Sequence, residues 1–241
     1  MKRIVDVLVA ALVLVLLSPL LVVVSILIWL QDRRSPFYIA DRVGRGMKPF
    51  RMVKFRSMVV NADKSGVDST SANDSRITSV GRFVRKTKLD EVPQMWNVLK
   101  GEMSLVGPRP NVSREVALYT DHEKQLLDVR PGITDYASIV FADEGDILAD
   151  KADPDIAYNQ LIRPAKSRLG LFYVSTHTVN ADLRLLLLTV VNALNREKAL
   201  AGCVAMLRKR HAPDDLCEIA TRTLELVPAP PPGSDGIVTR R

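Results

Sequence analysis

The feature that most constrains this chain is an apolar segment that runs from Ile4 to Leu30 with few polar interruptions. A straight helix of that length would be roughly 40 Å long, more than the hydrocarbon core of a bilayer, which is about 30 Å thick. The basic residues before it resemble the start of a signal peptide, but the apolar run is too long for one and no small-residue cleavage site follows. We therefore predict that the segment stays in the mature protein as a membrane anchor.

Ser18 and Pro19 lie in the middle of this segment. Proline removes a helical hydrogen bond and clashes with the preceding turn, so a kink or break is expected there. Two basic residues flank each end of the segment. A re-entrant helix would keep both flanks on the cytoplasmic side, as the positive-inside tendency favours, whereas a kinked single span would expose only two basic residues outside. The charges leave both topologies open, and in either one Asp6 belongs near an interface.

The whole chain is moderately basic. Its formal net charge of +7 favours anionic partners such as lipid headgroups or phosphorylated metabolites, although it also fits an ordinary solvated surface. Aromatic residues make up 5% of the chain and do not alternate with basic ones, so we expect no nucleic acid to be bound. The two cysteines and three histidines are scattered, whereas a zinc site needs clustered ligands. No zinc site is predicted.

The segments after the anchor show the periodicities of a mixed domain. Two β-prone runs at 36–40 and 51–55, separated by glycine and proline, predict a small hairpin. Apolar residues at helical spacing predict a helix over 89–99. The leucine-rich stretch 182–195 is helical and fits either core packing or a bilayer interface, with neither favoured. Residues 197–226 are expected to be helical, with a break near Pro213.

Asp90 and Glu91 stand in the first turn of the predicted 89–99 helix. Acidic residues are common there because the helix dipole stabilises them, so a structural role alone explains the pair. However, four basic residues lie just upstream: Arg82, Arg85, Lys86 and Lys88. The free amides at a helix start also bind phosphate oxygens. An ionised aspartate in that setting is equipped to attack phosphorus. Since neighbouring helix residues do not face each other, the second carboxylate could reach a metal ion.

Arg109 is a second candidate, because it lies between Pro108 and Pro110. The prolines leave its backbone little freedom to lose, and a planar fork of donors suits a phosphate or diphosphate. A proline-rich turn with a solvated arginine is the simpler interpretation. Lys54 and Arg56 alternate along a β-prone run and would project to one face of a strand, which is either an anion-binding surface or a solvated one.

The order of these motifs resembles the bacterial sugar transferase family, whose members are monotopic polyprenyl-phosphate phosphoglycosyl transferases. The resemblance runs from the anchor to about Asn195, and motifs this long in this order are highly specific. It rests on Lys54–Met58, Arg76–Phe83, Leu89–Leu99, Met103–Pro110 and Arg130–Thr134. The chain departs from the family pattern at Asp135–Ser138, where the family often has glycine, an aromatic residue and glutamine.

The resemblance implies an enzyme that moves a sugar phosphate from a UDP-sugar to undecaprenyl phosphate and releases UMP. Asp90 matches the family's aspartate that forms a covalent phosphosugar intermediate, and Glu91 matches the glutamate of a Mg²⁺-dependent site, so both are expected at the metal. Ser18-Pro19 matches the pair at which the family's N-terminal helix breaks and re-enters, which favours the re-entrant topology. Phosphate or substrate contacts are expected for Lys54, Arg56, Arg85, Arg109 and Asp182.

We therefore predict an α+β, mainly helical fold with a re-entrant, broken membrane helix, a small β-hairpin and interfacial amphipathic helices. The expected parts are a re-entrant anchor (1–34), a catalytic domain on the cytoplasmic face (35–198), a helical extension (199–226) and a disordered tail (227–241). The enzyme would act at the bacterial inner membrane, among membrane lipids, in the first membrane step of surface-glycan synthesis, with self-association left open. The alternatives are a transferase that moves the sugar without its phosphate and a basic membrane-anchored adaptor that binds anionic lipid.

Overall fold

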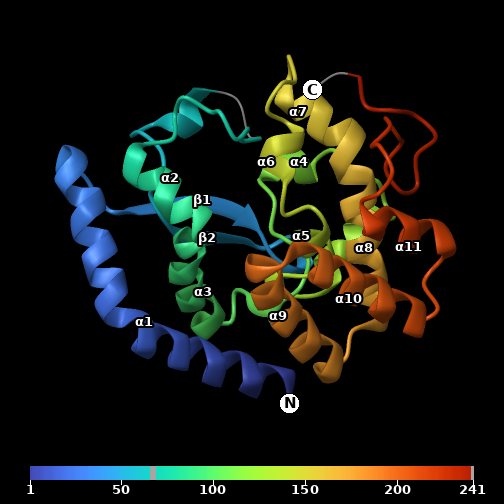
Figure 1. Ribbon diagram of the computed structural model, residues 1–241, viewed down its shortest axis with the longest axis horizontal. Coiled ribbons are helices and arrows are strands. Elements are labelled where there is room, and N and C mark those ends of the chain that lie inside the picture. Colours follow the sequence, from blue (N-terminus) through green and yellow to red (C-terminus); the bar gives the residue numbers. More distant parts are fainter. Residues whose placement is uncertain (66–68, 240–241) are drawn as a thin grey trace.

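The computed structural model describes residues 1–65 and 69–239 of the chain. Within these ranges the protein is mainly helical and has two pairs of short strands (Figure 1). The strands are β1 (Phe37–Val43), β2 (Pro49–Phe55), β3 (Ser104–Val106) and β4 (Gly132–Thr134). The helices of eight residues or more are α1 (Lys2–Asp32), α2 (Ser79–Lys86), α8 (Arg163–Thr176), α9 (Val179–Leu194), α10 (Arg196–Lys209) and α11 (Asp214–Thr221). Shorter α-helices are α3 (Met95–Lys100), α4 (Ser113–Val116), α5 (Tyr136–Val140), α6 (Glu144–Ile147) and α7 (Pro154–Ala157). The 3₁₀ helices are η1 (Arg45–Met47), η2 (Ala62–Ser65), η3 (Leu89–Gln94) and η4 (Glu123–Asp128), and η5 (Tyr158–Ile162) is a π-helix.

Helix α1 runs without interruption through Pro19. Pro19 has no N–H to donate to the Val15 carbonyl, and the Ser18 hydroxyl donates to that carbonyl instead, at 2.8 Å. Figure 1 shows α1 bending near its middle, so the predicted break is a bend within one continuous helix. Most of its side chains are exposed, and it is the one helix in the described part of the chain that is long and apolar enough to cross a membrane.

Both ends of α1 are tied to the rest of the protein by charged side chains. At the start, Lys2 forms an ion pair of 2.5 Å with Asp182 of α9. At the end, Asp32 pairs with Arg56, whose Nη2 donates to the carboxylate at 2.7 Å. Between these contacts the helix leaves a long apolar surface uncovered. The two ends of the anchor are therefore fixed to one and the same domain.

Asp6, expected near a membrane interface, lies in contact with the domain as well. It is buried and accepts hydrogen bonds from the Ser104 hydroxyl (2.8 Å) and the Leu105 amide (3.1 Å). Polar partners on β3 thus satisfy a carboxylate that lies on an otherwise apolar helix. Such pairing removes most of the cost of burying a charge.

The predicted β-hairpin is confirmed, with longer strands than the sequence indicated. β1 and β2 pair antiparallel, with Tyr38 opposite Lys54 and Val43 opposite Pro49. The turn between them contains Gly46 at φ 64°, a left-handed conformation that glycine adopts at low cost. Alternate side chains of the hairpin enter the main hydrophobic core, which is lined by Ala40, Met52, Val98, Met103, Leu105, Tyr136, Ile139, Leu169 and Leu185 among others.

The helix predicted over 89–99 is split in two. Residues 89–94 form the 3₁₀ turn η3, and the α-helix α3 begins only at Met95. Pro93 explains the difference, because it cannot donate the α-helical hydrogen bond to Leu89. The predicted end of the helix is confirmed to within one residue, since α3 ends at Lys100 and Gly101 follows with φ 83°.

The leucine-rich helix is confirmed as α9, and the sequence after it forms α10 and α11 with the expected break at Pro213. The helix predicted to reach residue 226 ends earlier, at Thr221, where Arg222 adopts a left-handed conformation with φ 58°. Residues 227–239, part of the segment predicted to be disordered, form neither helix nor strand. Gln160 contacts this segment twice, through its carbonyl to the Ala229 amide (3.0 Å) and through its side chain to the Val238 carbonyl (2.8 Å). Residues 240 and 241 lie outside the described part.

Candidate active site

The turn η3 positions the two adjacent carboxylates. Lys88, just before it, has φ 57°, a left-handed conformation that is uncommon for a residue other than glycine, and it redirects the chain out of α2. Asp90 is buried, with 9% of its surface exposed, and Glu91 is partly buried. Strained backbone of this kind concentrates at functional sites, and here it lies next to both candidate catalytic residues.

Glu91 lies between two cations. Arg109 donates from Nη2 to Glu91 Oε1 at 2.5 Å, and Lys54 Nζ lies 3.8 Å from the same oxygen. Burial by itself raises the pKa of Glu91, but the positive charges of Arg109 and Lys54 outweigh burial and lower that pKa to about 2. Glu91 is therefore ionised at neutral pH and holds both cations beside Asp90.

Asp90 has the opposite electrostatic environment. Burial, followed by the negative charge of Glu91, raises its pKa above the usual value, while Lys54, Arg85 and Arg109 oppose the rise. Its Oδ1 atom is buried and accepts no hydrogen bond within the described part of the chain. Buried polar atoms are nearly always hydrogen-bonded. Asp90 thus offers an unengaged carboxylate oxygen on which both the negative charge of Glu91 and the positive charges of three basic residues act.

Lys54 enters the site from β2. Burial, followed by the positive charge of Arg109, lowers its pKa from 10.5 to about 8. Asn97 of α3 fixes the strand, because it accepts a hydrogen bond from the Val53 amide (2.9 Å) and donates one to the Arg51 carbonyl (2.7 Å). The buried Asn97 therefore holds Lys54 at a constant position relative to η3.

Arg109 enters from the loop after β3, and two glycines set the position of that loop. A Cβ atom on Gly132 would lie 2.0 Å from the Gly107 nitrogen, so only glycine allows this approach. The approach places the Gly132 amide 3.0 Å from the Pro108 carbonyl. The charge of Glu91 raises the pKa of Arg109 above its already high value. The guanidinium is thus permanently charged and preorganised.

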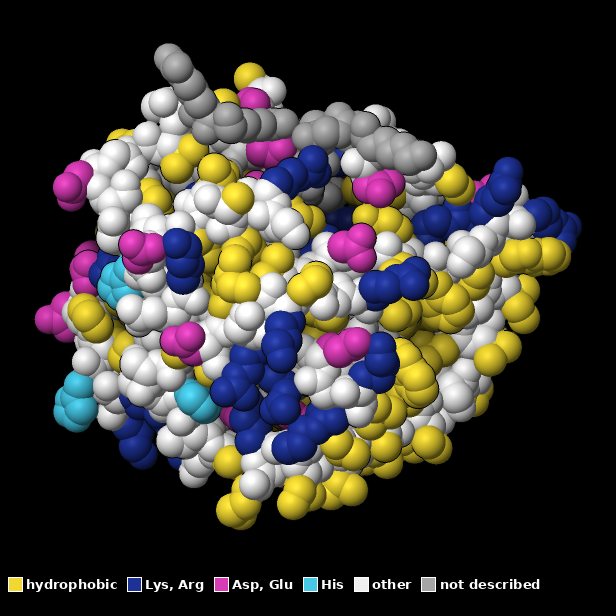
Figure 2. All heavy atoms as spheres, turned by 180° about the vertical axis from the view of Figure 1, so that it is seen from behind, with side chains coloured by type: hydrophobic (Ala, Val, Ile, Leu, Met, Phe, Trp, Pro, Cys, Tyr) yellow, Lys and Arg dark blue, Asp and Glu magenta, His cyan; other side chains and the backbone are white. Residues whose placement is uncertain are grey.

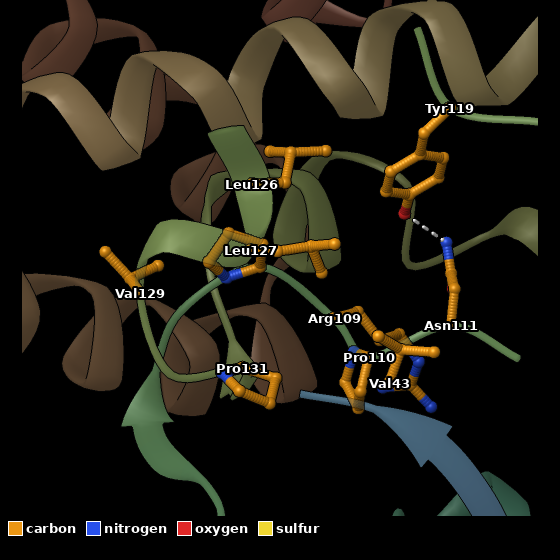
Figure 3. Close-up of a pocket in the computed structure, with 10 residues that line it drawn as sticks. Val43, Arg109, Pro110, Asn111, Tyr119, Leu126, Leu127, Val129 and Pro131 are labelled. Carbon is orange, nitrogen blue, oxygen red and sulfur yellow. Dashed lines mark hydrogen bonds between the residues drawn. The ribbon is translucent and has the colours of Figure 1, made fainter. Parts of the chain in front are cut away.

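A small cavity lies behind the Pro-Arg-Pro turn (Figure 3). Its walls come from this turn, η4 and Tyr119, whose hydroxyl accepts a hydrogen bond from the Asn111 side chain at 2.8 Å. Its volume is about 10 Å³, which suits a single water molecule. A nucleotide sugar does not fit there, so the charged cluster of Lys54, Asp90, Glu91 and Arg109 is the candidate site.

The structure brings some of the predicted site residues together and separates others. Lys54, Asp90, Glu91 and Arg109 form one cluster, and Arg85 lies close enough to influence the pKa of Asp90. Arg56, predicted to share a face with Lys54, instead pairs with Asp32 of α1. The strand ends at Phe55, so the alternation of side chains does not extend to it.

Asp182 lies in another cluster. It is buried and accepts hydrogen bonds from Lys2 and from the Tyr173 hydroxyl, at 2.5 and 2.7 Å. The Tyr173 hydroxyl also donates to the Val106 carbonyl at 3.0 Å. The observed contacts of Asp182 therefore join the start of α1 to α8 and α9.

The residues at the site suit a magnesium ion only in part. Within residues 1–65 and 69–239, no three His, Cys, Asp or Glu side chains gather as a complete set of metal ligands. Mg²⁺, however, usually takes one or two carboxylates and completes its coordination with water and substrate phosphates. The free, buried Oδ1 of Asp90 next to Glu91 fits that pattern.

No sequence motif indicates Glu144 and Lys166, two charged residues of the tertiary structure. They form an ion pair between α6 and α8, and Glu144 influences the pKa of Arg109. Neither belongs to a recognisable motif, and they lie far from Arg109 in the sequence, so no local pattern points to them.

Comparison with known proteins adds independent findings. Residues 1–196 match the family model described as bacterial sugar transferase. The chain is 38% identical over 166 residues to a UDP-N-acetylgalactosamine-undecaprenyl-phosphate N-acetylgalactosaminephosphotransferase of Aeromonas hydrophila, covering 65% of this chain and 38% of the relative. It is 34% identical over 202 residues to a UDP-glucose:undecaprenyl-phosphate glucose-1-phosphate transferase of Klebsiella pneumoniae, covering 82% of this chain and 41% of the relative.

A third relative is an undecaprenyl-phosphate galactose phosphotransferase of Salmonella typhimurium, 42% identical over 152 residues, which cover 56% of this chain and 31% of that protein. The chain thus spans less than half the length of each of these three relatives. Their names carry three different sugars, so likeness to them does not select a donor.

Proposed function

This chain belongs to the bacterial sugar transferase family, and from that premise we propose that it transfers a sugar 1-phosphate from a UDP-sugar to undecaprenyl phosphate and releases UMP. The observation that carries this proposal is the state of Asp90. Among the described residues its buried Oδ1 has no hydrogen-bond partner, and the positive charges of Lys54, Arg85 and Arg109 act on the carboxyl group. An unengaged carboxylate oxygen is available to attack phosphorus, and nearby cations can neutralise the incoming phosphate.

The proposed reaction has two steps at one site. A carboxylate oxygen of Asp90 attacks the phosphorus that bears the sugar, an O–P bond forms, and the bond to the bridging oxygen breaks, with its electron pair leaving on UMP. A phosphate oxygen of undecaprenyl phosphate then attacks the same phosphorus and displaces Asp90 as a free carboxylate. A soluble donor and a membrane-bound acceptor thus use the site in turn.

The positive groups around Asp90 account for much of the catalysis. Donor and acceptor are both anions, so phosphoryl transfer depends on positioning and on charge neutralisation. Arg109 presents a fixed guanidinium, and Lys54 a buried ammonium held by Asn97 through its strand. Glu91 keeps both cations in place before the donor arrives.

Magnesium is part of the proposal, with Asp90 and Glu91 as its protein ligands. When bound, Mg²⁺ would neutralise charge on the diphosphate. The closeness of the two carboxyl groups, seen in the effect of the Glu91 charge on the pKa of Asp90, supports this assignment.

The proposed setting is the cytoplasmic face of the bacterial inner membrane, with α1 as a re-entrant helix. The ion pairs Lys2–Asp182 and Asp32–Arg56 support re-entry, because they fix both ends of α1 to one domain. A straight span would carry one end to the far side of the bilayer.

The exposed side of α9 supports an interfacial position for that helix. Its outward residues are apolar and recur at helical spacing: Leu183, Leu187, Val190 and Leu194. Figure 2 shows further apolar side chains along the edge of the molecule on which α1 lies in Figure 1, and Lys and Arg side chains beside them. That combination suits an anionic lipid surface.

Product analysis tests the proposed reaction. Purified protein, Mg²⁺, undecaprenyl phosphate and a panel of UDP-sugars should give UMP and a lipid that carries a sugar diphosphate. Release of UDP with a lipid monophosphate sugar would show that the sugar moves without its phosphate. No nucleotide release from any donor, together with binding to anionic vesicles, would favour the adaptor.

A further inference from the structure

Three basic side chains meet at the C-terminal end of α3, apart from the charged cluster of the candidate active site. Arg3 of α1 donates through both Nη atoms to two carbonyls in the last turn of α3, at 2.5 and 2.8 Å. Arg130, which precedes β4, donates from Nε to the Gly101 carbonyl at 2.9 Å. Lys100 is the last residue of α3 itself. One end of a short helix thus gathers three positive charges.

The two guanidinium groups both lie against Gly101. A Cβ atom on Gly101 would lie 3.4 Å from Arg3 Nη2, and the Gly101 carbonyl accepts the hydrogen bond from Arg130. Both arginines are partly buried, and their contacts with backbone carbonyls hold them in place. Like charges held side by side repel each other, and an anion between them removes that repulsion.

The protein supplies little negative charge at this place. Within residues 1–65 and 69–239, neither Arg3 nor Arg130 forms an ion pair with a carboxylate. Glu102 is already engaged, because Oε1 pairs with Lys100 at 2.6 Å and Oε2 accepts a hydrogen bond from Asn97 at 2.7 Å. The dipole of α3 adds only about half a negative elementary charge. Each guanidinium has five N–H groups, so most of them remain available to an anion.

The basic cluster adjoins the membrane anchor. Arg3 is followed directly by Ile4, and on α1 both Ile4 and Leu8 expose 64% of their surface. Trp96, four residues before Lys100, lies on the same face of α3 and is 56% exposed. Tryptophan and basic side chains concentrate where a bilayer meets water. Figure 2 shows Lys and Arg side chains gathered beside apolar ones near the lower edge, where α1 begins in Figure 1.

We infer that Arg3, Lys100 and Arg130 form a binding site for the phosphate of an anionic phospholipid headgroup, an inference that rests on the membrane location proposed above. The phosphate oxygens accept hydrogen bonds from the free N–H groups of the three side chains, and the exposed apolar side chains of α1 contact the acyl chains. Phosphatidylglycerol fits this site, whereas a zwitterionic headgroup brings a further cation to it.

This site is separate from the place where the proposed reaction occurs. Along η3 and α3, Lys100 lies roughly 15 Å from Asp90. A phosphate at the basic cluster is therefore too far from Asp90 to be the reacting phosphate of the acceptor.

Binding is measured with the full-length protein in micelles of an uncharged detergent, to which phosphatidylglycerol or phosphatidylcholine with the same acyl chains is added. Phosphatidylglycerol should raise the melting temperature of the wild type more than phosphatidylcholine does, and the same concentration of inorganic phosphate should not raise it. A basic residue near a lipid surface contributes about 1 kcal/mol. Lys100→Gln should therefore weaken binding of phosphatidylglycerol roughly fivefold, and the double variant Arg3→Gln/Arg130→Gln roughly 30-fold. The control Lys151→Gln/Lys209→Gln removes two exposed charges elsewhere and should bind like the wild type.

Tryptophan fluorescence locates the bound lipid. The chain has two tryptophans, so the emission of a Trp29→Phe variant comes from Trp96 alone. Brominated phosphatidylglycerol should quench this emission more strongly than brominated phosphatidylcholine. The difference should disappear when Arg3→Gln and Arg130→Gln are added.

Several outcomes would overturn the inference. Equal affinity of the wild type for the two phospholipids would do so, as would unchanged affinity of a folded double variant for phosphatidylglycerol. If the double variant does not fold, Lys100→Gln decides, because it leaves the arginine contacts in place. Stabilisation by inorganic phosphate would assign the cluster to a soluble anion, and tighter binding of undecaprenyl phosphate would assign it to the acceptor. UMP release is measured separately, and its absence would refute the proposed function without touching the lipid site.

Discussion

Lys54 gives a prediction that follows from burial and charge together. Its ammonium is largely buried beside Arg109, and its pKa is lowered from 10.5 to about 8. If Lys54 must be charged to bind the donor diphosphate, kcat/KM should decline above pH 8, because this constant reports the ionisation of the free enzyme. About one-tenth of the side chains remain charged at pH 9 and about one-hundredth at pH 10.

The size of the decline follows from the interaction that is lost. A hydrogen bond between an ammonium and a phosphate contributes about 2 kcal/mol, which corresponds to roughly 30-fold in kcat/KM. The wild type should therefore fall roughly 30-fold between pH 7.5 and pH 10 and level off at the value of Lys54→Gln. The kcat/KM of Lys54→Gln should be low over the whole pH range and show no such decline. Lys54→Arg should also lack the decline of kcat/KM, since a guanidinium stays charged up to pH 10.

Stability supplies an independent check of the same ionisation. The folded-state pKa is below the unfolded value, so between pH 8 and 10.5 the unfolded chain binds more protons than the folded one. The free energy of unfolding should therefore rise with pH across this window by about 3 kcal/mol, and Lys54→Gln should lack the rise. A decline of kcat/KM near pH 8 that persists in Lys54→Arg would refute the assignment.

Three further predictions concern the framework of the site. Gly132→Ala should destabilise the protein by about 1–3 kcal/mol and lower UMP release, because the new Cβ would lie 2.0 Å from the Gly107 nitrogen. Gly236→Ala is the matched control. Equal melting temperatures for the two variants would contradict the packing argument. Asp182→Asn breaks the ion pair with Lys2 and should lower the melting temperature, while the protein should still become labelled by the sugar phosphate of the donor. Loss of this labelling at unchanged stability would instead give Asp182 a direct role in the chemistry. The topology of α1 is tested in a chain whose buried Cys203 and Cys217 are replaced by serine. In that chain, the single variants Arg3→Cys and Arg34→Cys should react with a membrane-impermeant thiol reagent from the cytoplasmic side only. Labelling of the two positions from opposite sides would rule out re-entry.

Contiguous motifs made much of the site predictable. Asp90, Glu91 and Arg109 lie in short stretches whose proline and charge content carries a physical meaning, and the structure places them together with Lys54. The hairpin was predictable for the same reason, because its turn residues are local signals.

Pairings between distant residues were not predictable. The ion pairs Arg56–Asp32 and Lys166–Glu144 join side chains that only the tertiary fold brings together. Pro93 shows a second limit, since the apolar periodicity around it indicated an α-helix while its missing N–H produced a 3₁₀ turn. Tertiary context and backbone chemistry decide such cases.

The central claim is that Asp90 attacks the donor, and trapping the intermediate tests it most directly. Purified protein would be incubated with Mg²⁺ and sugar-labelled UDP-sugars in the absence of lipid, then digested and analysed by mass spectrometry. Asp90→Asn is the test variant. Asp150→Asn, a change at an exposed position, is its control. We predict a phosphosugar attached to the peptide that contains Asp90, released by undecaprenyl phosphate, present in Asp150→Asn and absent from Asp90→Asn. Turnover with lipid by a protein whose Asp90 never carries the label would contradict the account.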